Sequence, residues 1–271
     1  MDDYCILAPD EMSQLSGRMM KFSAQMPQHK LAPLLAEWFD SELGQELIEH
    51  ERALAEQVLP TLFGYHLLQV GYDCRQTLFE TSPVSRKVML IPAMQLGAGP
   101  FTILAEHEEL PVLNNEVDVV ILHHALDFAT NPHQVLREAA RVLRPGGHLV
   151  SFSFNPASYW GLRRLTRRRV PPMWSGHFIR LGRLHDWLSL LEMTELKTRS
   201  ACHHLPLKSP KWRQRLRWFE KLSQRVPMHS GATMMVLARK DVVGMTPIKP
   251  EWRRRRILSM PVPEPKPTAR G

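Results

Sequence analysis

Two adjacent histidines, His123 and His124, directly follow an apolar run at positions 117–122. Such a run predicts a strand buried on both faces of a parallel sheet, and open sheets of this kind bind ligands at the carboxyl ends of their strands. An imidazole titrates near neutral pH, so a histidine at this edge could act as a general base. The alternative is that one ring packs beneath the loop while the other faces solvent.

Further polar residues follow closely, namely Asp127, Asn131 and His133. Carboxylate, amide and imidazole groups can all bind metals, but the spacing of these three matches no firm metal signature. The three cysteines of the chain are few and far apart, which argues against a disulfide framework or a cysteine-only metal site. We therefore predict no metal site.

The segment around the histidines predicts one complete strand–helix–strand crossover. Pro132 suits the first turn of a helix, because its fixed φ fits there and its missing N–H is not needed. Apolar residues then recur at helical spacing as far as Leu143. The sequence Pro-Gly-Gly at 145–147 ends the helix and turns the chain into a second strand at 148–154.

The same residues carry a family resemblance. LPVLNNEVDVV at 110–120, followed by VLRPGG and a strand, resembles the second half of a class I S-adenosylmethionine-dependent methyltransferase with a type 11 domain. Asp118 matches the acid that opens the fourth strand of that family, and positions 141–147 match the turn before its fifth strand. Segments such as NPASYWGLRRL and RLHDWLSLL also resemble an uncharacterised bacterial subgroup of methyltransferase-like proteins.

The resemblance covers positions 31–240 and implies an α/β fold. This fold is a doubly wound, Rossmann-like and mostly parallel sheet with helices on both faces, here with an N-terminal helical extension. The apolar pattern agrees, since positions 31–63 predict two helices, the second capped by Asp40 or Ser41. A further helix is expected at 183–191, and further strands at 65–70, 87–91, 101–104, 195–201 and 233–239.

Members of this family bind S-adenosylmethionine at a glycine-rich loop after the first strand, where glycines let the backbone approach the cofactor. Gly71 matches the first glycine of that loop. Asp73 stands at the place of the second, and no third follows. The resemblance puts Asp73 at the amino-acid end of the cofactor, where its carboxylate could pair with the ammonium group.

Other expected cofactor contacts are altered too. The family's ribose-binding acid after the second strand is missing from positions 89–95, where Gln95 could bond one hydroxyl instead. The segment 92–99 is too short for the usual crossover helix. AEHEELPV matches the family's GDAEELPF, which places Glu106 at the adenine amino group with His107 beside it. The alternative is a solvated acidic loop.

The loop that holds the paired histidines borders the methyl-transfer centre in this family. The resemblance therefore makes His123 a cofactor contact, and both His123 and His124 candidate bases. Two other positions could line the substrate side, namely His177 and the pair at 203–204.

Positive charge is concentrated in the C-terminal part of the chain. Positions 1–160 hold 10 Lys and Arg against 20 Asp and Glu, whereas positions 161–271 hold 25 against 7. This asymmetry predicts either a surface for nucleic acid or another anionic partner, or only a solvated basic tail. Candidate contacts include the segment 211–217 and Arg163, Arg164, Arg167, Arg168, Arg169, Arg253, Arg254, Arg255 and Arg256.

A chain of 271 residues suits one domain with tails. We expect an N-terminal tail at 1–30, the methyltransferase-like domain at 31–240, and a basic, proline-rich, disordered tail at 241–271. The chain has no run of 18 apolar residues, so no membrane span is expected. The absence of a secretory signal pattern and the few cysteines suit a cytoplasmic protein.

Three hypotheses for the function follow. The first is an S-adenosylmethionine-dependent methyltransferase that acts on RNA, a protein or a small metabolite, with the basic C-terminal half favouring an anionic acceptor. The second is a catalytically inactive binding or regulatory module, as the altered glycine loop suggests. The third is a protein that acts mainly by binding nucleic acid.

Overall fold

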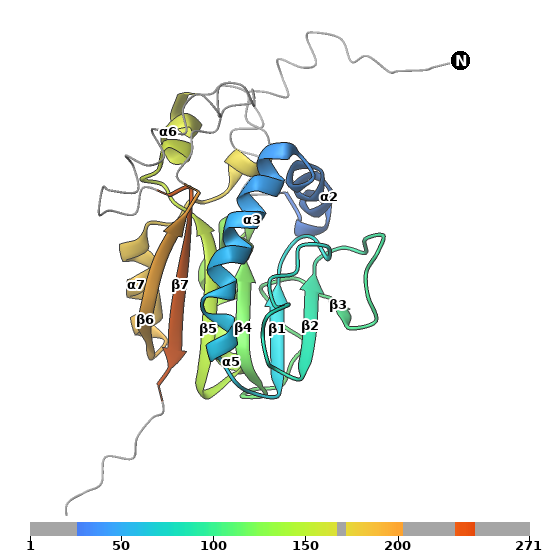
Figure 1. Cartoon of the computed structure of the whole chain (residues 1–271), viewed down its shortest axis with the longest axis vertical. Coiled ribbons are helices and arrows are strands. Elements are labelled where there is room, and N and C mark those ends of the chain that lie inside the picture. The colour runs from blue at the N-terminus through green and yellow to red at the C-terminus, as the bar shows by residue number, and fades with distance from the viewer. Residues whose placement is uncertain (1–25, 167–171, 203–230, 242–271) are drawn as a thin grey trace, which may run out of the picture.

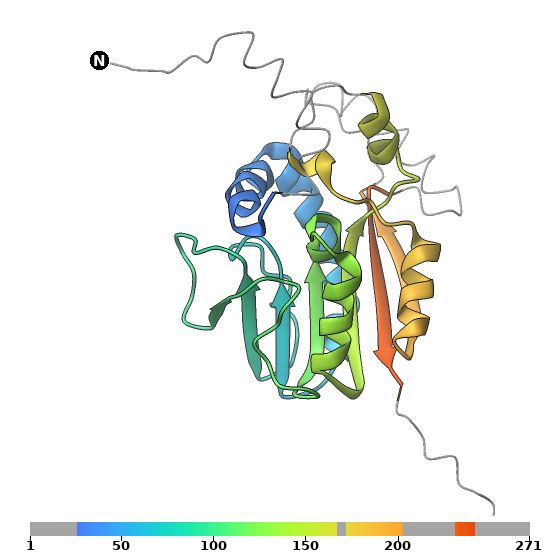
Figure 2. The ribbon, with the colours of Figure 1, turned by 180° about the vertical axis from the view of Figure 1, so that it is seen from behind.

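A computed structural model describes residues 26–166, 172–202 and 231–241. Its core is a seven-stranded sheet in the order β3-β2-β1-β4-β5-β7-β6. Helices cover both faces of this sheet (Figures 1 and 2). The predicted fold class, a doubly wound and mostly parallel α/β sheet with N-terminal helices, is confirmed.

Strands β1 to β5 run parallel, and β7 is antiparallel to its neighbours β5 and β6. Each predicted strand is present with bounds within a few residues of those expected. The strands are β1 (His66–Val70), β2 (Arg86–Ile91), β3 (Thr102–Leu104), β4 (Val117–His123), β5 (Leu143–Phe154), β6 (Met193–Ala201) and β7 (Thr233–Lys240).

The two predicted N-terminal helices are α2 (Gln28–Phe39) and α3 (Glu42–Glu56). Ser41 caps α3, since its side chain accepts a hydrogen bond from the backbone N–H of Gly44 at 3.2 Å. Helix α3 lies along one face of the sheet, whereas α2 lies at the carboxyl ends of the strands (Figure 1). A short turn, η1 (Leu59–Thr61), leads from α3 into β1.

The opposite face of the sheet is covered by helices α5 and α7 (Figure 2). Asn131 caps α5 and Pro132 is its first residue, as expected for a proline in the first helical turn. The Pro-Gly-Gly turn bulges out of the first part of β5, where Gly146 has a φ of 82°. The helices and short turns after β4 are α4 (Ala125–Phe128), α5 (Pro132–Val142), α6 (Tyr159–Thr166), η2 (Pro172–Ser175) and α7 (Leu181–Leu190).

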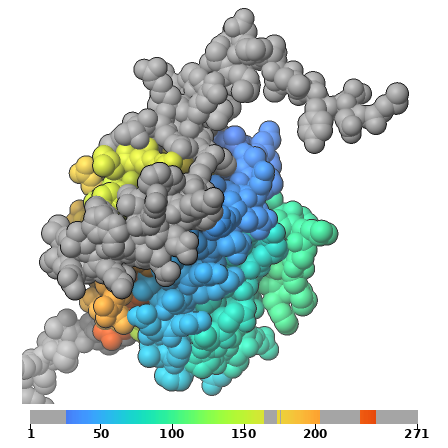
Figure 3. Space-filling model, turned by 45° about the horizontal axis from the view of Figure 1, so that its top comes forward, coloured from blue at the N-terminus to red at the C-terminus, as the bar shows by residue number. Residues whose placement is uncertain are grey.

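Neither connection among β1, β2 and β3 contains a helix. The short segment after β2 was expected to lack one, but the segment 71–85 after β1 lacks one as well. Viewed with its top forward, the molecule shows the N-terminal helices packed beside these loops (Figure 3). Within the described ranges, no helix combines the length and the apolar character that a bilayer crossing requires.

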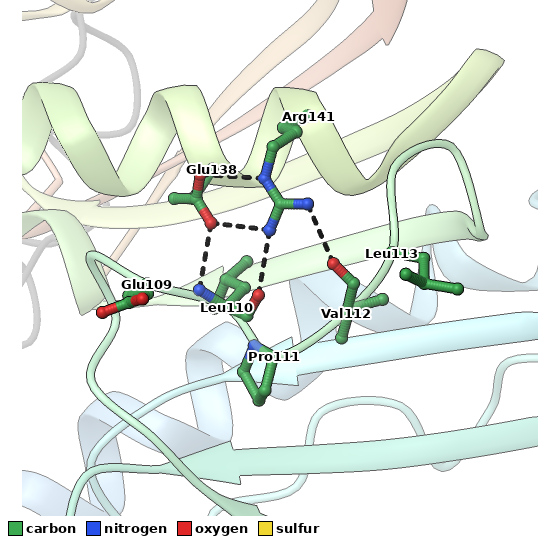
Figure 4. Close-up of a pocket in the computed structure, with 7 residues that line it drawn as sticks. All are labelled: Glu109, Leu110, Pro111, Val112, Leu113, Glu138 and Arg141. Atoms are coloured by element: carbon green, nitrogen blue, oxygen red, sulfur yellow. Dashed lines mark hydrogen bonds and ion pairs between the residues drawn. The ribbon is translucent and has the colours of Figure 1, made fainter.

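Arg141 of α5 fixes the segment between β3 and β4, which forms one wall of the candidate site. Its guanidinium donates hydrogen bonds to the carbonyl oxygens of Val112 and Leu110, both at 2.9 Å. The carboxylate of Glu138 accepts from Arg141 at 2.7 Å and from the backbone N–H of Leu110 at 3.0 Å (Figure 4). These bonds border a surface pocket of about 420 Å³.

We expect Arg141→Gln to destabilise the fold by about 2 kcal/mol, because it leaves two carbonyl groups and the Glu138 carboxylate without their donor. Urea unfolding monitored by circular dichroism measures this loss. Arg137→Gln is the matched control on the same helix, since Arg137 is exposed and, within the described part of the chain, its side chain bonds only to Gln134, at 3.3 Å. Equal losses in the two variants would contradict this role for Arg141.

Candidate functional site

The carboxyl ends of β1 and β4 meet beneath α2, and there the structure brings together several of the predicted site residues. Gly71, His107 and His123 lie close to one another, because His107 Nε2 is 3.0 Å from the Gly71 carbonyl oxygen and Gly71 lies against the His123 Cβ. Glu106, the expected adenine contact, is exposed at the surface, whereas its neighbour His107 is buried in the site.

The Asp73 carboxylate is bound entirely within its own loop. One oxygen accepts from the backbone N–H and the Nε of Arg75, both at 3.0 Å, and the other accepts from Arg75 Nη2 at 2.8 Å. Arg75 also pairs with Asp40 at the end of α2 at 3.0 Å. The expected pairing of Asp73 with the cofactor ammonium therefore does not fit this arrangement, because a nearby guanidinium already neutralises the carboxylate.

Two glutamine side chains hold the same loop closed. Gln95, expected at the ribose, instead accepts from the Cys74 N–H at 2.9 Å and donates to the Tyr72 carbonyl at 2.5 Å. Gln69, which no motif of the sequence singled out, donates to the Gln76 carbonyl at 2.6 Å and accepts from the Leu78 backbone N–H at 2.9 Å. A polar residue in the middle of an otherwise apolar strand was the signal that could have identified Gln69.

The side chain of Tyr72 fills the space beside Gly71. It is only 1% exposed, and its ring packs edge-on against His107 at 4.6 Å and Phe128 at 5.7 Å. Its hydroxyl has no hydrogen-bond partner among the described residues, and neither has His107 Nδ1. Burial lowers the pKa of His107 to about 4, so this ring is neutral and polar but not charged.

Helix α2 closes this region from above. The Gln28 side chain accepts from the His107 backbone N–H at 3.1 Å and donates to the Glu108 carboxylate. Phe39, at the other end of the helix, packs on the rings of His123 and His124 at 5.7 and 5.9 Å. Helix α2 thus contacts His107 at one end and the paired histidines at the other.

The candidate bases His123 and His124 belong to a buried chain of acids and imidazoles. Glu51 of α3 places one carboxylate oxygen 2.9 Å from His123 Nε2 and the other 2.9 Å from His124 Nε2. Asp127 of α4 lies 2.8 Å from His124 Nδ1 and accepts the Phe154 backbone N–H at 2.9 Å. None of these four side chains is more than 2% exposed.

These contacts shift the pKa values of the four buried side chains. Burial alone would raise the pKa of Glu51, but the charge of His124 and the hydrogen bonds from both histidines lower it to about 2. Burial would likewise lower the pKa of His124, but the charge of Glu51 and the bonds to Asp127 and Glu51 raise it to about 9. Burial dominates at His123, whose pKa is lowered, and at Asp127, whose pKa is raised.

This arrangement does not suit the expected role of either histidine as a free base. His124 is protonated at neutral pH and lies between two carboxylates, and His123 directs its Nε2 at Glu51. His177 is exposed, and its ring nitrogen lies 3.0 Å from the Ala129 carbonyl oxygen. The pair at 203–204 lies outside the described residues.

The proposed anionic contacts are mostly outside the part of the chain that the structure describes. Arg163 and Arg164 lie in α6, near the carboxyl end of the sheet (Figure 1). The arginines at 167–169 and 253–256 and the segment 211–217 are not among the described residues.

Comparison with known proteins agrees with this architecture. A family described as a methyltransferase domain matches residues 66–151. The uncharacterized protein YafS of Escherichia coli (strain K12) is 34% identical over 241 residues, which cover 86% of this chain and 92% of that protein.

Solved structures superpose on most of the chain. An S-adenosylmethionine-dependent methyltransferase of Thermotoga maritima, described as a possible histamine N-methyltransferase, has a TM-score of 0.62 at 17% identity and covers 80% of this chain and 100% of its own. A chain from the complex of the Haloferax volcanii Trm112 methyltransferase activator with a putative methyltransferase has a TM-score of 0.56 at 15% identity, over 79% and 99%.

The chain belongs to the same family as YafS and carries a methyltransferase domain at residues 66–151, in the fold of class I methyltransferases. The predicted family is thereby confirmed, and a methyltransferase domain of this kind indicates S-adenosylmethionine as the cofactor. The relative that spans most of its length has no assigned activity.

The loop after β1 does not fit the amino-acid end of the cofactor as it is arranged here. The Tyr72 ring and the Asp73–Arg75 pair stand where the family has an open glycine backbone. Three buried polar atoms nevertheless lack hydrogen-bond partners among the described residues at this edge, namely Tyr72 Oη, His107 Nδ1 and Asp127 Oδ1. The site thus has polar groups for a ligand, while the Tyr72 side chain and the Asp73–Arg75 pair occupy the loop that would receive its methionine part.

The buried group of Glu51, His123, His124 and Asp127 predicts how the stability of the metal-free protein depends on pH. The pKa of His124 is about 9 when folded and about 6.5 when unfolded, so its contribution is complete below pH 6.5 and is lost as the pH rises through 9. The contribution of Glu51 is complete above about pH 4.5 and is lost as the pH falls toward 2. We expect the thermal midpoint to fall by roughly 5–10 °C between pH 6.5 and 9.5.

Differential scanning calorimetry in the presence of a chelator measures this dependence. His124→Gln should reduce the fall of the thermal midpoint at alkaline pH. His185→Gln should keep this fall, because the His185 side chain is 62% exposed and does not belong to the buried group. An unchanged fall in His124→Gln would show that another group is responsible.

Proposed function

We propose that the protein is an S-adenosylmethionine-dependent methyltransferase whose cofactor site opens when the Tyr72 side chain leaves it, and whose acceptor is anionic. The observation that carries this proposal is the group of unpaired polar atoms at the carboxyl edge of a methyltransferase domain. A buried polar group without a partner costs about 1–3 kcal/mol. A polar ligand that replaced the Tyr72 ring could pair with His107 Nδ1 and Asp127 Oδ1 and so recover part of that energy.

The chemistry of the acceptor follows from the state of the two histidines. Methyl transfer depends mainly on positioning of the reacting groups, and a base is needed only for acceptors that must lose a proton. His123 and His124 are both held by carboxylates, so neither is free to take a proton. An acceptor that is already nucleophilic, such as a ring nitrogen of a nucleobase, suits this site.

The charge distribution supports an anionic acceptor, with RNA as the class to test first. Positions 161–271 carry 25 Lys and Arg against 7 Asp and Glu. Clustered cations bind phosphates with the release of counterions, which gives affinity without requiring sequence readout. A basic C-terminal part attached to a methyltransferase domain could therefore hold a polyanion beside the site.

The closed loop favours a second candidate function, that of a binding module without catalysis. Asp73, Gln69 and Gln95 satisfy backbone and side-chain groups of the loop internally, so it is stable without a ligand. A loop that has become a structural element no longer needs a cofactor. The two candidates differ in whether S-adenosylhomocysteine binds at all.

Tyr72→Ala should strengthen the binding of S-adenosylhomocysteine. If the cofactor binds only after the Tyr72 ring leaves, only the small fraction of open wild-type molecules can bind it, and the apparent affinity is correspondingly low. Removing the ring makes all molecules competent to bind and so raises the apparent affinity. We expect at least about 10-fold tighter binding by isothermal titration calorimetry. Tyr65→Ala is the control, because Tyr65 is 70% exposed at the opposite end of β1, and its affinity should equal that of the wild type.

Circular dichroism should accompany this titration, since a buried aromatic ring is removed. Tyr72→Phe provides a milder variant that removes only the unpaired hydroxyl and should fold normally. If the wild type, Tyr72→Phe and Tyr72→Ala all fail to bind while remaining folded, the enzyme proposal fails and the binding module remains.

RNA binding should depend steeply on salt if the basic residues contact phosphates. Each phosphate contact with a single strand contributes about 0.7 to the slope of log K against log salt. Replacing the four arginines at 253–256 by glutamine should lower that slope by roughly 2–3, as measured by fluorescence anisotropy with an RNA oligonucleotide. The matched control replaces four cations of the acidic part, namely Arg52, Arg86, Lys87 and Arg137. A slope that does not change in the first variant, or falls equally in both, would exclude the tail as the contact.

A further inference from the structure

We infer that Glu51, His123 and His124 form a binding site for one divalent transition-metal ion, with Zn²⁺ as the expected occupant. One ligand atom from each of these residues lies within 4.8 Å of the other two. Both imidazoles direct Nε2 at the Glu51 carboxylate from 2.9 Å. The inference does not depend on the proposed methyl transfer, because none of its ligands has to contact the cofactor.

The sequence pattern did not predict this site, because one ligand comes from a distant helix. The spacing of Asp127, Asn131 and His133 matches no metal signature. The structure separates them, since Asn131 caps α5 and His133 packs against the Trp187 ring at 5.3 Å. Only Asp127 belongs to the cluster, where it contacts a ligand and not the ion.

The hydrogen-bond geometry requires a proton or a cation between His124 and Glu51. Asp127 accepts a hydrogen bond from His124 Nδ1 at 2.8 Å, so in a neutral ring the proton is on Nδ1 and Nε2 carries a lone pair. That lone pair faces a carboxylate oxygen of Glu51 at 2.9 Å. Two lone pairs do not attract each other, so the contact needs either a proton on Nε2, as in the protein without an ion, or a metal ion that binds both atoms and replaces that proton.

The same geometry matches the usual environment of metal-binding histidines. Such a histidine donates its second ring N–H to a carboxylate, which fixes the tautomer and the orientation of the ring. Asp127 fills this role and is itself held by the Phe154 backbone N–H at 2.9 Å. His124 is therefore oriented toward Glu51 whether or not an ion is present.

The charges balance with a divalent ion. Glu51 and Asp127 supply two negative charges, and the two imidazoles are neutral when they bind a metal. One divalent cation makes the cluster neutral, which matters because the four side chains are 0–2% exposed and a net charge there is costly.

Two imidazole nitrogens and one carboxylate oxygen are a ligand set of Zn²⁺ sites. Tetrahedral zinc with bonds of about 2.0–2.1 Å separates neighbouring ligand atoms by roughly 3.3 Å. Each imidazole faces a different oxygen of Glu51 at 2.9 Å, and the three ligand atoms already lie within 4.8 Å of one another, so modest shifts of these side chains would bring them to the spacing that zinc requires. No fourth protein ligand joins this group among the described residues, so water or a residue elsewhere in the chain would complete the coordination.

Untagged full-length protein, stripped with a chelator, should bind one equivalent of Zn²⁺ in a calorimetric titration. Binding to the folded state should raise the thermal midpoint by roughly 8 °C or more when free Zn²⁺ exceeds the Kd about 1,000-fold. Glu51→Gln and His123→Gln should lose this equivalent. Asp127→Asn should weaken binding by about 10–100-fold, because it perturbs a ligand without removing one. His185→Gln is the control and should bind like the wild type.

The wild-type protein provides a test that does not depend on whether these buried variants fold. X-ray absorption of the zinc-loaded protein should show only nitrogen and oxygen neighbours, with the multiple scattering of two imidazoles. A sulfur neighbour would place the ion elsewhere and overturn the inference. The inference also fails if the stripped wild type binds no stoichiometric Zn²⁺, or if folded Glu51→Gln and His123→Gln retain it.

Discussion

The burial of the Glu51 carboxylate is the constraint on which the remaining structure depends. A fully buried carboxylate is unfavourable by several kcal/mol unless a positive partner neutralises it, and Glu51 is 0% exposed. It lies on the same helical face as Leu54 and Ala55, which pack against the sheet. Helix α3 can therefore take only the position in which this face meets the sheet and Glu51 meets the imidazoles at the end of β4. Because Asp40 and Ser41 alone join the two helices, this position also places α2 over the edge of the sheet.

The closed loop after β1 follows from the missing crossover helix. A helix satisfies its own backbone hydrogen bonds, whereas a loop over 71–85 must find partners for each buried N–H and carbonyl group. The side chains of Gln69, Asp73 and Gln95 supply several of these partners. Asp73 and Gln95 lie where the family has cofactor-binding groups. The residues at these positions thus stabilise the helix-free loop, which is compatible with an intact sheet although the glycine pattern is altered.

Local rules were enough to predict the elements of this fold but not the site. Pro132 marked the start of α5 and Ser41 the start of α3 because capping depends on neighbours within a few residues. The buried strands were visible as apolar runs for the same reason. The contact of Glu51 with His123 joins positions 72 residues apart, and no periodicity in the sequence encodes it. The burial of Tyr72 depends on α2 and α4 together. The family pattern could therefore show that the glycine-rich loop was altered, but not which side chain fills the space beside Gly71.

Asp127 connects the two halves of the site. One carboxylate oxygen accepts from His124 and the Phe154 backbone, while the other has no hydrogen-bond partner among the described residues. Its charge contributes, after burial and Glu108, to raising the pKa of the Tyr72 hydroxyl. An ion at the histidines would change the protonation of the chain that includes Asp127, and a ligand at Tyr72 would meet the free oxygen of the same carboxylate. If both places bind their ligands, the two act on one buried carboxylate, and this shared group is the physical route by which binding at one would alter the free energy of binding at the other.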